Sequence, residues 1–190
     1  MKLGETLYIT SKRAWRSWLA KNYRSKSEIW LVYYKKKTGR LRISYNDAVD
    51  EALCYGWIDS TVKSIDEKRF AQRFTPRRKK SVLSQMNRER VRKLIAQKRM
   101  TKAGLKAIAH VFDPSTDVAK KPIVPVEVQK ALKADPKAWQ NFQKFPVSYQ
   151  RMRLAYVESQ KKHDRKLYKA AVRYLVKMSA RNKRFGLIHE

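Results

Sequence analysis

The chain has 190 residues, is 43% hydrophobic and 11% aromatic, and carries a formal charge of +30 from 46 Lys/Arg and 16 Asp/Glu. A chain of this length buries about 70% of its unfolded surface, so the sequence excludes whole-chain disorder and requires neither a disulfide nor a metal for folding. The single cysteine, Cys54, excludes an internal disulfide, and no apolar run approaches the length of about 18 residues that a transmembrane helix needs. The N-terminal MKLGETLYIT lacks the features of a signal peptide, so we expect a cytoplasmic protein.

Helical and strand patterns alternate in the first half of the chain. Ser11 is a good N-cap residue, and the large apolar side chains after it recur at helical spacing, which predicts a helix over residues 11–22. Residues 28–34 are apolar on both faces, which is typical of a central strand. Beyond the turn that follows, Leu41 and Ile43 alternate with polar residues and predict a hairpin partner for that strand.

A second helix and two more strands are predicted before the first proline. Ser44 precedes Asp47 by three residues, as in a capping box, and Gly56 ends the apolar helical pattern that begins there. Residues 57–63 and 69–75 then have the composition and alternation of two strands joined by a short turn.

Helical patterns fill the rest of the chain. Ser84 and Thr101 are predicted N-caps of helices over residues 85–97 and up to residue 109. Further helices are predicted over residues 127–134, 136–144, 147–160 and 164–179. Strands followed by helices favour an α+β fold, here a small antiparallel sheet of about four strands flanked by helices, with a C-terminal helical subdomain.

The predicted domain organisation follows these patterns. We expect an α+β core domain over residues 1–112, a proline-containing linker over 113–126, a helical C-terminal subdomain over 127–180 and a frayed basic tail over 181–190. The excess of positive charge is not confined to the tail, because residues 1–110 carry 28 basic and 9 acidic side chains. A polyanionic partner would relieve the self-repulsion of so cationic a domain.

The densest cationic segment runs from Arg69 to Lys102, with 13 Lys/Arg and one acid, Glu89. Clustered cations in a basic domain are typical of proteins that contact phosphates, although an ordinary solvated surface is the alternative. The predicted nucleic-acid or polyanion-binding residues are Lys35, Lys36, Lys37, Arg40, Arg77, Arg78, Lys79, Lys80, Arg88, Arg92 and Arg99.

Aromatic side chains lie among these cations, and two interpretations of them are open. Tyr33, Tyr34, Trp57 and Phe74 would stack on bases if they were exposed, whereas large apolar rings are usually buried in a core. The basic helices within residues 147–179 would lie on anionic lipid if their apolar faces were free, but those faces have the spacing of a helical-hairpin seam.

A small-anion pocket is a second candidate site. Asp59 on one predicted strand would pair with an arginine on the next, either to support the fold or to position an anion beside the helix that begins after Ser84. The residues of this candidate pocket are Trp57, Asp59, Arg73, Arg77, Ser84 and Asn87. The sequence contains no Gly-rich phosphate loop, no G-x-S-x-G and no Cys/His metal spacing, so it predicts no cofactor or metal and favours a non-enzymatic protein.

Several motifs occur in a characteristic order: EIWLVYYKKKTG, ISYNDAVDEALCYGWID, RFAQRFTPRR and SVLSQMNRERVRKLIAQKRMTKAGL. They are followed by Pro-Val-Glu at Pro125–Glu127, FQKFPVSY at Phe142–Tyr149 and a basic helix from His163 to Ala180. Together these motifs, roughly from Trp15 to Lys183, resemble the YdeI/OmpD-associated family, which is also labelled as bacteriocin-protection proteins. Ser60 departs from the family by replacing a common Gly, and Leu83 by replacing a common Trp.

The resemblance implies an association with stress resistance and names no reaction. Residues and resemblance together favour a non-enzymatic, cytoplasmic protein that binds polyanions, with the nucleic-acid backbone as the first choice. One alternative is a small-anion or enzymatic pocket at Asp59, Arg73, Arg77 and Asn87. Another is an envelope or antimicrobial-peptide resistance factor that acts through protein or lipid contacts.

Overall fold

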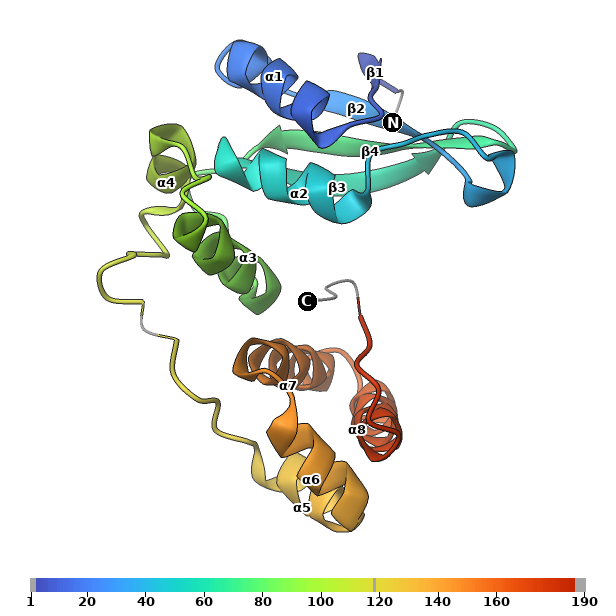
Figure 1. Cartoon of the computed structure of the whole chain (residues 1–190), viewed down its shortest axis with the longest axis vertical. Coiled ribbons are helices and arrows are strands. Elements are labelled where there is room, and N and C mark those ends of the chain that lie inside the picture. The colour runs from blue at the N-terminus through green and yellow to red at the C-terminus, as the bar shows by residue number, and fades with distance from the viewer. Residues whose placement is uncertain (1–2, 118, 187–190) are drawn as a thin grey trace. The chain divides into compact units, whose positions relative to one another are not determined.

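The computed structural model describes residues 3–117 and 119–186, and the chain divides into two compact units, Met1–Pro114 and Ser115–Glu190. The predicted α+β class is confirmed, because the first unit holds a four-stranded sheet with helices and the described part of the second unit is helical (Figure 1). None of the helices in the described part of the chain has the length and apolar character required to cross a membrane.

The sheet is mixed rather than wholly antiparallel. Its order is β1-β2-β4-β3, in which β1 pairs parallel to β2 while β4 pairs antiparallel to both β2 and β3. The three longer strands are the ones that alternation predicts. The strands are β1 (Thr6–Tyr8), β2 (Ile29–Tyr34), β3 (Trp57–Ser64) and β4 (Arg69–Pro76).

The hairpin partner predicted at Leu41 and Ile43 is wrong, because the segment forms no strand. Both edges of β2 are already occupied, one by β4 and the other by β1. Ile43 is buried and donates its backbone N–H to the carbonyl of Ile9 at 3.2 Å, whereas Leu41 is 78% exposed. The short 3-10 helix η1 (Lys36–Thr38) and the left-handed Gly39 carry the chain to this position.

Helices α1 (Lys12–Asn22) and α2 (Tyr45–Cys54) lie side by side against one face of the sheet (Figure 1). Their predicted N-caps are confirmed, since the hydroxyls of Ser11 and Ser44 accept from backbone N–H groups three residues on. The core between helices and sheet contains Tyr33, Trp57 and Phe74, all buried, so these rings belong to the core. Of the four aromatic candidates for stacking, Tyr34 alone is half-buried.

Helix α3 (Gln85–Ala96) and helix α4 (Lys102–Ile108) pack through a second apolar cluster that includes Val91 and Ile108. Helix α4 is fastened to the C-terminus of α2 by Thr101, whose backbone N–H and hydroxyl both donate to the carbonyl of Cys54, at 3.1 and 2.6 Å. The same hydroxyl accepts from the N–H of Gly104 at 3.1 Å and caps α4, as predicted. These bonds fix where α4 presents its outer face.

Gly104 permits this close approach, and Gly104→Ala is expected to destabilise the first unit. A Cβ at this position would lie 2.3 Å from the carbonyl oxygen of Cys54 and 2.7 Å from its carbonyl carbon, both rigid backbone atoms. The substitution favours the helix by about 1 kcal/mol through propensity, but overpacking of this kind costs about 1–3 kcal/mol. We expect a lower midpoint in urea unfolding. A raised midpoint would show that propensity prevails and that α4 is not tightly docked.

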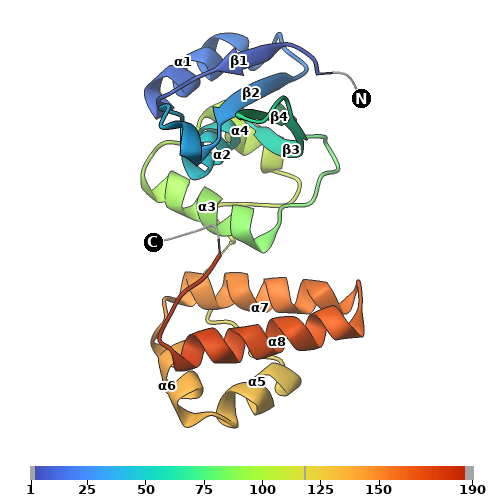
Figure 2. The ribbon, with the colours of Figure 1, turned by 90° about the vertical axis from the view of Figure 1, so that its right-hand side faces the viewer.

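The second unit packs its helices in two pairs (Figure 2). Helices α7 and α8 run side by side, and α5 and α6 pack together and against α8. Buried apolar residues, among them Leu132, Phe142 and Leu175, form its interior. The four predicted helices are confirmed as α5 (Val126–Lys133), α6 (Pro136–Lys144), α7 (Val147–Lys161) and α8 (Arg165–Ala180).

The segment after α8 corrects the prediction of a frayed tail over residues 181–190. Phe185 donates its backbone N–H to the hydroxyl of Tyr149 at 3.0 Å, and its ring packs edge-on against Tyr149 and Tyr174. The guanidinium of Arg153 lies 5.1 Å from the same ring. These contacts of Phe185 hold the segment against α7 and α8. Residues 187–190 lie outside the described residues.

Candidate functional site

The predicted pairing of Asp59 with an arginine of the next strand, Arg73 or Arg77, does not form among the hydrogen bonds and ion pairs of the described residues. Asp59 is aligned with Phe74, so it shares the helix-covered face, whereas Arg73 is one residue along and points to the opposite face. Asp59 accepts from the hydroxyl of Tyr45 at 2.8 Å and from the amide of Gln72 at 3.1 Å. Burial, followed by the bond to Asp59, raises the pKa of the Tyr45 hydroxyl, which keeps it a donor.

The other members of that candidate pocket are also dispersed. Arg73 pairs with Glu28, its Nε donating to Oε2 at 2.7 Å, and this pair lowers the pKa of Glu28. Ser84 accepts from the N–H of Asn87 at 3.3 Å and caps α3. The two remaining members, Trp57 and Arg77, do come together, since both line one cavity of the first unit.

The predicted cations separate into groups at opposite ends of β4. Lys35, Lys37 and Arg40 lie where β4 begins, beside the turn that contains Asp66 and Glu67. Arg40 donates to the hydroxyl of Tyr34 at 3.0 Å and lies 4.7 Å from the centre of that ring. Two carboxylates among the lysines make this end of the sheet a mixed-charge surface rather than a cationic one.

Three of the predicted polyanion contacts, Arg88, Arg92 and Arg99, do not form an open surface. All three side chains are half-buried and engaged within the first unit. Arg88 donates to the carbonyl of Val111 at 3.0 Å, Arg92 donates to Glu89 at 2.6 Å, and Arg99 donates to Glu51 at 2.6 Å. Carboxylates and a carbonyl within the first unit, including Glu89 on the same helix as Arg92, accept hydrogen bonds from all three, so we do not assign polyanion contacts to them.

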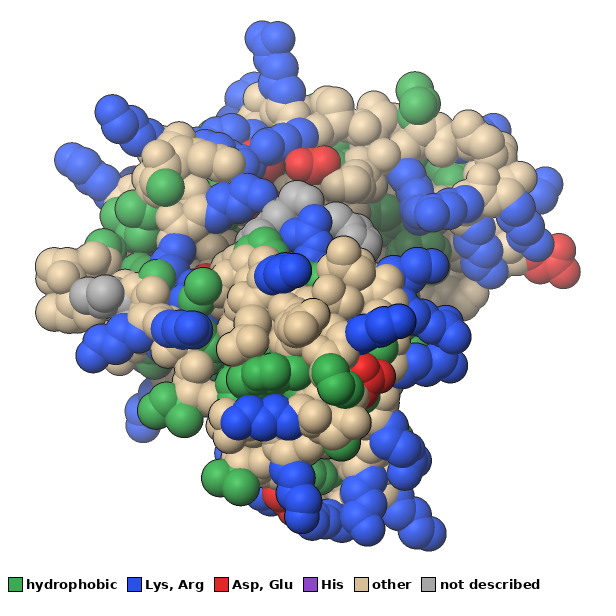
Figure 3. Space-filling view, turned by 60° about the horizontal axis from the view of Figure 1, so that its bottom comes forward, with side chains coloured by type: hydrophobic (Ala, Val, Ile, Leu, Met, Phe, Trp, Pro, Cys, Tyr) green, Lys and Arg blue, Asp and Glu red, His purple; other side chains and the backbone are tan. Residues whose placement is uncertain are grey.

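The predicted cations beyond the end of β4 are presented to solvent. Arg78, Lys79 and Lys80 are exposed, and the loop that carries them runs alongside α4, where the carbonyl of Ser81 lies 3.0 Å from Nε2 of His110. In the view of Figure 3, Lys and Arg side chains are scattered over the surface with few acids between them.

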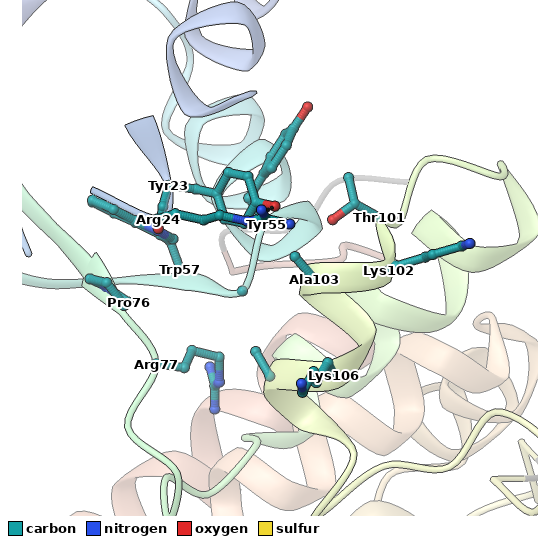
Figure 4. A pocket seen from close by; sticks show the side chains of 12 residues that line it. Tyr23, Arg24, Tyr55, Trp57, Pro76, Arg77, Thr101, Lys102, Ala103 and Lys106 are labelled. Atoms are coloured by element: carbon teal, nitrogen blue, oxygen red, sulfur yellow. Dashed lines mark hydrogen bonds between the residues drawn. The ribbon is translucent and has the colours of Figure 1, made fainter. Parts of the chain in front are cut away.

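A cavity of about 820 Å³ opens beside this loop, and we take it as the candidate site. It lies between the ends of α1 and α2, the start of β3, the end of β4 and one side of α4 (Figure 4). The residues that line it are Tyr23, Arg24, Tyr55, Gly56, Trp57, Pro76, Arg77, Thr101, Lys102, Ala103, Lys106 and Ala107.

Backbone contacts build the floor and walls of this cavity. Gly56 has a φ of 76°, and a Cβ there would lie 2.6 Å from the Cβ of Ala107, so a glycine is needed for β3 to start this close to α4. The N–H of Arg77 donates to the carbonyl of Gly56 at 2.9 Å, and the indole N–H of Trp57 donates to the carbonyl of Tyr23 at 3.2 Å. The cavity is therefore held on one side by a main-chain hydrogen bond and on another by a bond from the Trp57 side chain to the main chain.

The cavity is cationic. Arg24, Arg77, Lys102 and Lys106 contribute to its lining, and no acidic side chain does so among the described residues. Arg77 enters from the β4 side and Lys106 from α4, so their charged groups face the same space (Figure 4). Nη2 of Arg77 donates to the carbonyl of Val82 at 2.8 Å, while its Nε is buried without a hydrogen-bond partner in the described structure. Burial lowers the pKa of this guanidinium, which still remains charged at neutral pH.

Of the residues that line the cavity, the sequence predicted Trp57 and Arg77 as site residues and did not predict the others. Lys102 and Lys106 lie four positions apart after a confirmed N-cap, so their shared helix face was a usable signal. Arg24 carries no comparable local signal, because it reaches the cavity from the far end of α1.

Two family models match the chain, and the gap between the two matches contains the boundary between the two compact units. Residues 7–107 match the family model described as a domain of unknown function (DUF8412). Residues 121–182 match the family model described as "Bacteriocin-protection, YdeI or OmpD-Associated", which confirms the family resemblance and places the match on the helical unit. No curated protein and no solved structure matches the chain.

Proposed function

We propose that the first unit binds polyanions through their phosphates. The chain belongs to the DUF8412 family, and its helical unit matches the bacteriocin-protection, YdeI or OmpD-associated family. Nucleic acid is the proposed partner and the cytoplasm the proposed location. The binding surface, called here the cationic face, consists of Arg24, Arg77, Arg78, Lys79, Lys80, Lys102 and Lys106.

The observation that supports this proposal is the uniform sign of charge around the cavity. Four cations line it without an acid among the described lining residues, and three exposed cations follow on the adjoining loop. The end of the sheet near Lys37 is different, since Asp66 and Glu67 share that surface. Flexible cations gathered around a concavity provide the contacts that a phosphate backbone requires.

Binding of this kind is expected to tolerate any base sequence. Phosphate contacts orient a protein on nucleic acid, while base-edge contacts read the sequence. The cationic face consists of lysine and arginine side chains and contains none of the amides or acids that read adenine and cytosine edges. We therefore propose a binding protein rather than an enzyme, with stress protection as its cellular role.

The test is fluorescence anisotropy of labelled duplex DNA, single-stranded DNA and RNA over about 50–200 mM salt. If six or seven cations contact phosphates, affinity falls by about 10³-fold or more across this range, because each contact releases a counterion. Absence of binding at the lowest salt, or an affinity that does not vary with salt, would overturn the proposal. Sedimentation with anionic vesicles but not with nucleic acid would instead favour the envelope alternative.

A further inference from the structure

The cavity is large enough to take a ligand rather than only to contact a surface. Its volume of about 820 Å³ lies within the range of about 300–1,000 Å³ that is typical of small-molecule sites. The outer surface of a duplex cannot fill such a concavity, because its bases are stacked and paired inside. An unpaired nucleotide can be splayed out of a strand and can enter a pocket.

The lining of the cavity combines flat apolar groups with donors. Tyr23, Tyr55 and Trp57 contribute aromatic surface, and the two tyrosine rings have centroids 5.5 Å apart. Tyr23 and Tyr55 are half-buried and line the cavity, whereas Trp57 belongs to the core. The guanidinium groups of Arg24 and Arg16 lie 5.2 and 5.4 Å from the ring centres of Tyr23 and Tyr55, respectively. Proteins that bind single-stranded nucleic acids combine aromatic rings with cations, because every base has a face that can stack on a ring.

Arg77 supplies a second, independent indication of an anionic ligand. Its Nε is buried without a partner in the described structure, although its Nη2 is bonded to Val82. A buried donor without a partner is costly, so the environment of this guanidinium is not fully satisfied. Its side chain also lines the cavity, where a phosphate would bind the guanidinium by charge-assisted hydrogen bonds. Lys106 lines the same cavity from α4, so a phosphate bound there would lie among cations from both sides (Figure 4).

We infer that the cavity holds one unpaired nucleotide of a single strand, with its base against Tyr23 and Tyr55 and its phosphate on Arg77 and Lys106. This inference rests on the proposed function and narrows the partner to single-stranded nucleic acid. The exposed cations of the neighbouring loop would then follow the backbone on one side of the cavity.

The first experiment uses the unmodified protein and two strands of equal charge. A 20-nucleotide DNA strand and an abasic strand with the same number of phosphates are compared by anisotropy at one salt concentration. We expect the normal strand to bind about tenfold more tightly or better, as stacking of a single base allows. Equal affinities would overturn the inference while leaving phosphate binding intact. Failure of both strands to bind would instead overturn the proposed function.

Ala103→Leu locates the effect, because Ala103 lines the cavity on α4 and a leucine would fill part of it without a change of charge. We expect the preference for the normal over the abasic strand to fall severalfold, with the salt dependence unchanged. Ala170→Leu, at an exposed position of α8, is the matched control. A folded Ala103→Leu protein that keeps the full preference would overturn the assignment to this cavity, and the abasic comparison stands even if that variant does not fold.

Discussion

Glu51→Gln is expected to lower the free energy of unfolding by about 3 kcal/mol. The carboxylate of Glu51 is 1% exposed on α2 and accepts from Arg16 and from Arg99, each at 2.6 Å. It thereby joins α1 and α2 to the segment that precedes α4. Loss of its charge leaves two guanidinium groups without a buried counter-charge, and the breaking of a buried pair is strongly destabilising. Urea unfolding followed by circular dichroism measures the change.

Glu127→Gln is the matched control for this prediction. Glu127 also bridges two cations, Arg165 at 2.6 Å and Lys161 at 3.7 Å, and its hydrogen bond with Arg165 lowers its pKa to about 2. Its side chain is 46% exposed, however, so solvent screens these interactions and we expect little change in stability. Equal effects of the two substitutions would show that burial of Glu51 does not govern its contribution.

The Glu51 cluster also bears on function, because it removes Arg99 from the set of surface cations. Sequence spacing grouped Arg99 with Arg88 and Arg92, yet the partner of Arg99 comes from a helix nearly fifty residues earlier, at a separation of 48 positions. Charge counts along a sequence cannot reveal such partners. In this chain they distinguish cations that stabilise the fold from cations that remain free to meet a ligand.

Local signals predicted the elements of the fold well. Ser11, Ser44, Ser84 and Thr101 each cap the helix that was expected after them, because a cap involves backbone groups only three residues away. Strand β1 was not predicted, because the contacts that form it are distant in the sequence. It spans three residues and pairs parallel to β2 across the whole of α1, so its existence depends on a non-local edge rather than on its own composition.

The candidate site was predictable only in part. Trp57 and Arg77 lie at the ends of paired strands, and strand alternation brought them into the same region. The predicted Asp59–Arg73 pair failed through a shift of one position in register, which exchanges the faces of a strand. The two lysines of α4 reach the cavity through the packing of α4 on α2, which depends on Gly104 and Thr101 more than on any charged residue, and Arg24 reaches it from the end of α1.

Replacing Arg78, Lys79 and Lys80 together by Gln is expected to weaken nucleic-acid binding by about 500-fold at 0.1 M salt. Each lost phosphate contact removes about 0.9 from the slope of log affinity against log salt, so the slope should become less negative by about 2.7. All three side chains are exposed and no helix or strand includes them, so the fold should be retained. Anisotropy titrations across a salt series measure both quantities.

The control for this variant separates position from net charge. Lys130, Lys137 and Lys144 are exposed on α5 and α6 of the helical unit, and their replacement by Gln lowers the formal charge from +30 by the same three units. If binding were a response to total charge alone, both triple variants would weaken it equally. If the loop beside the cavity makes the contacts, the first variant loses affinity and slope together. The second variant then keeps nearly all of both, because its three lysines do not belong to the proposed binding surface.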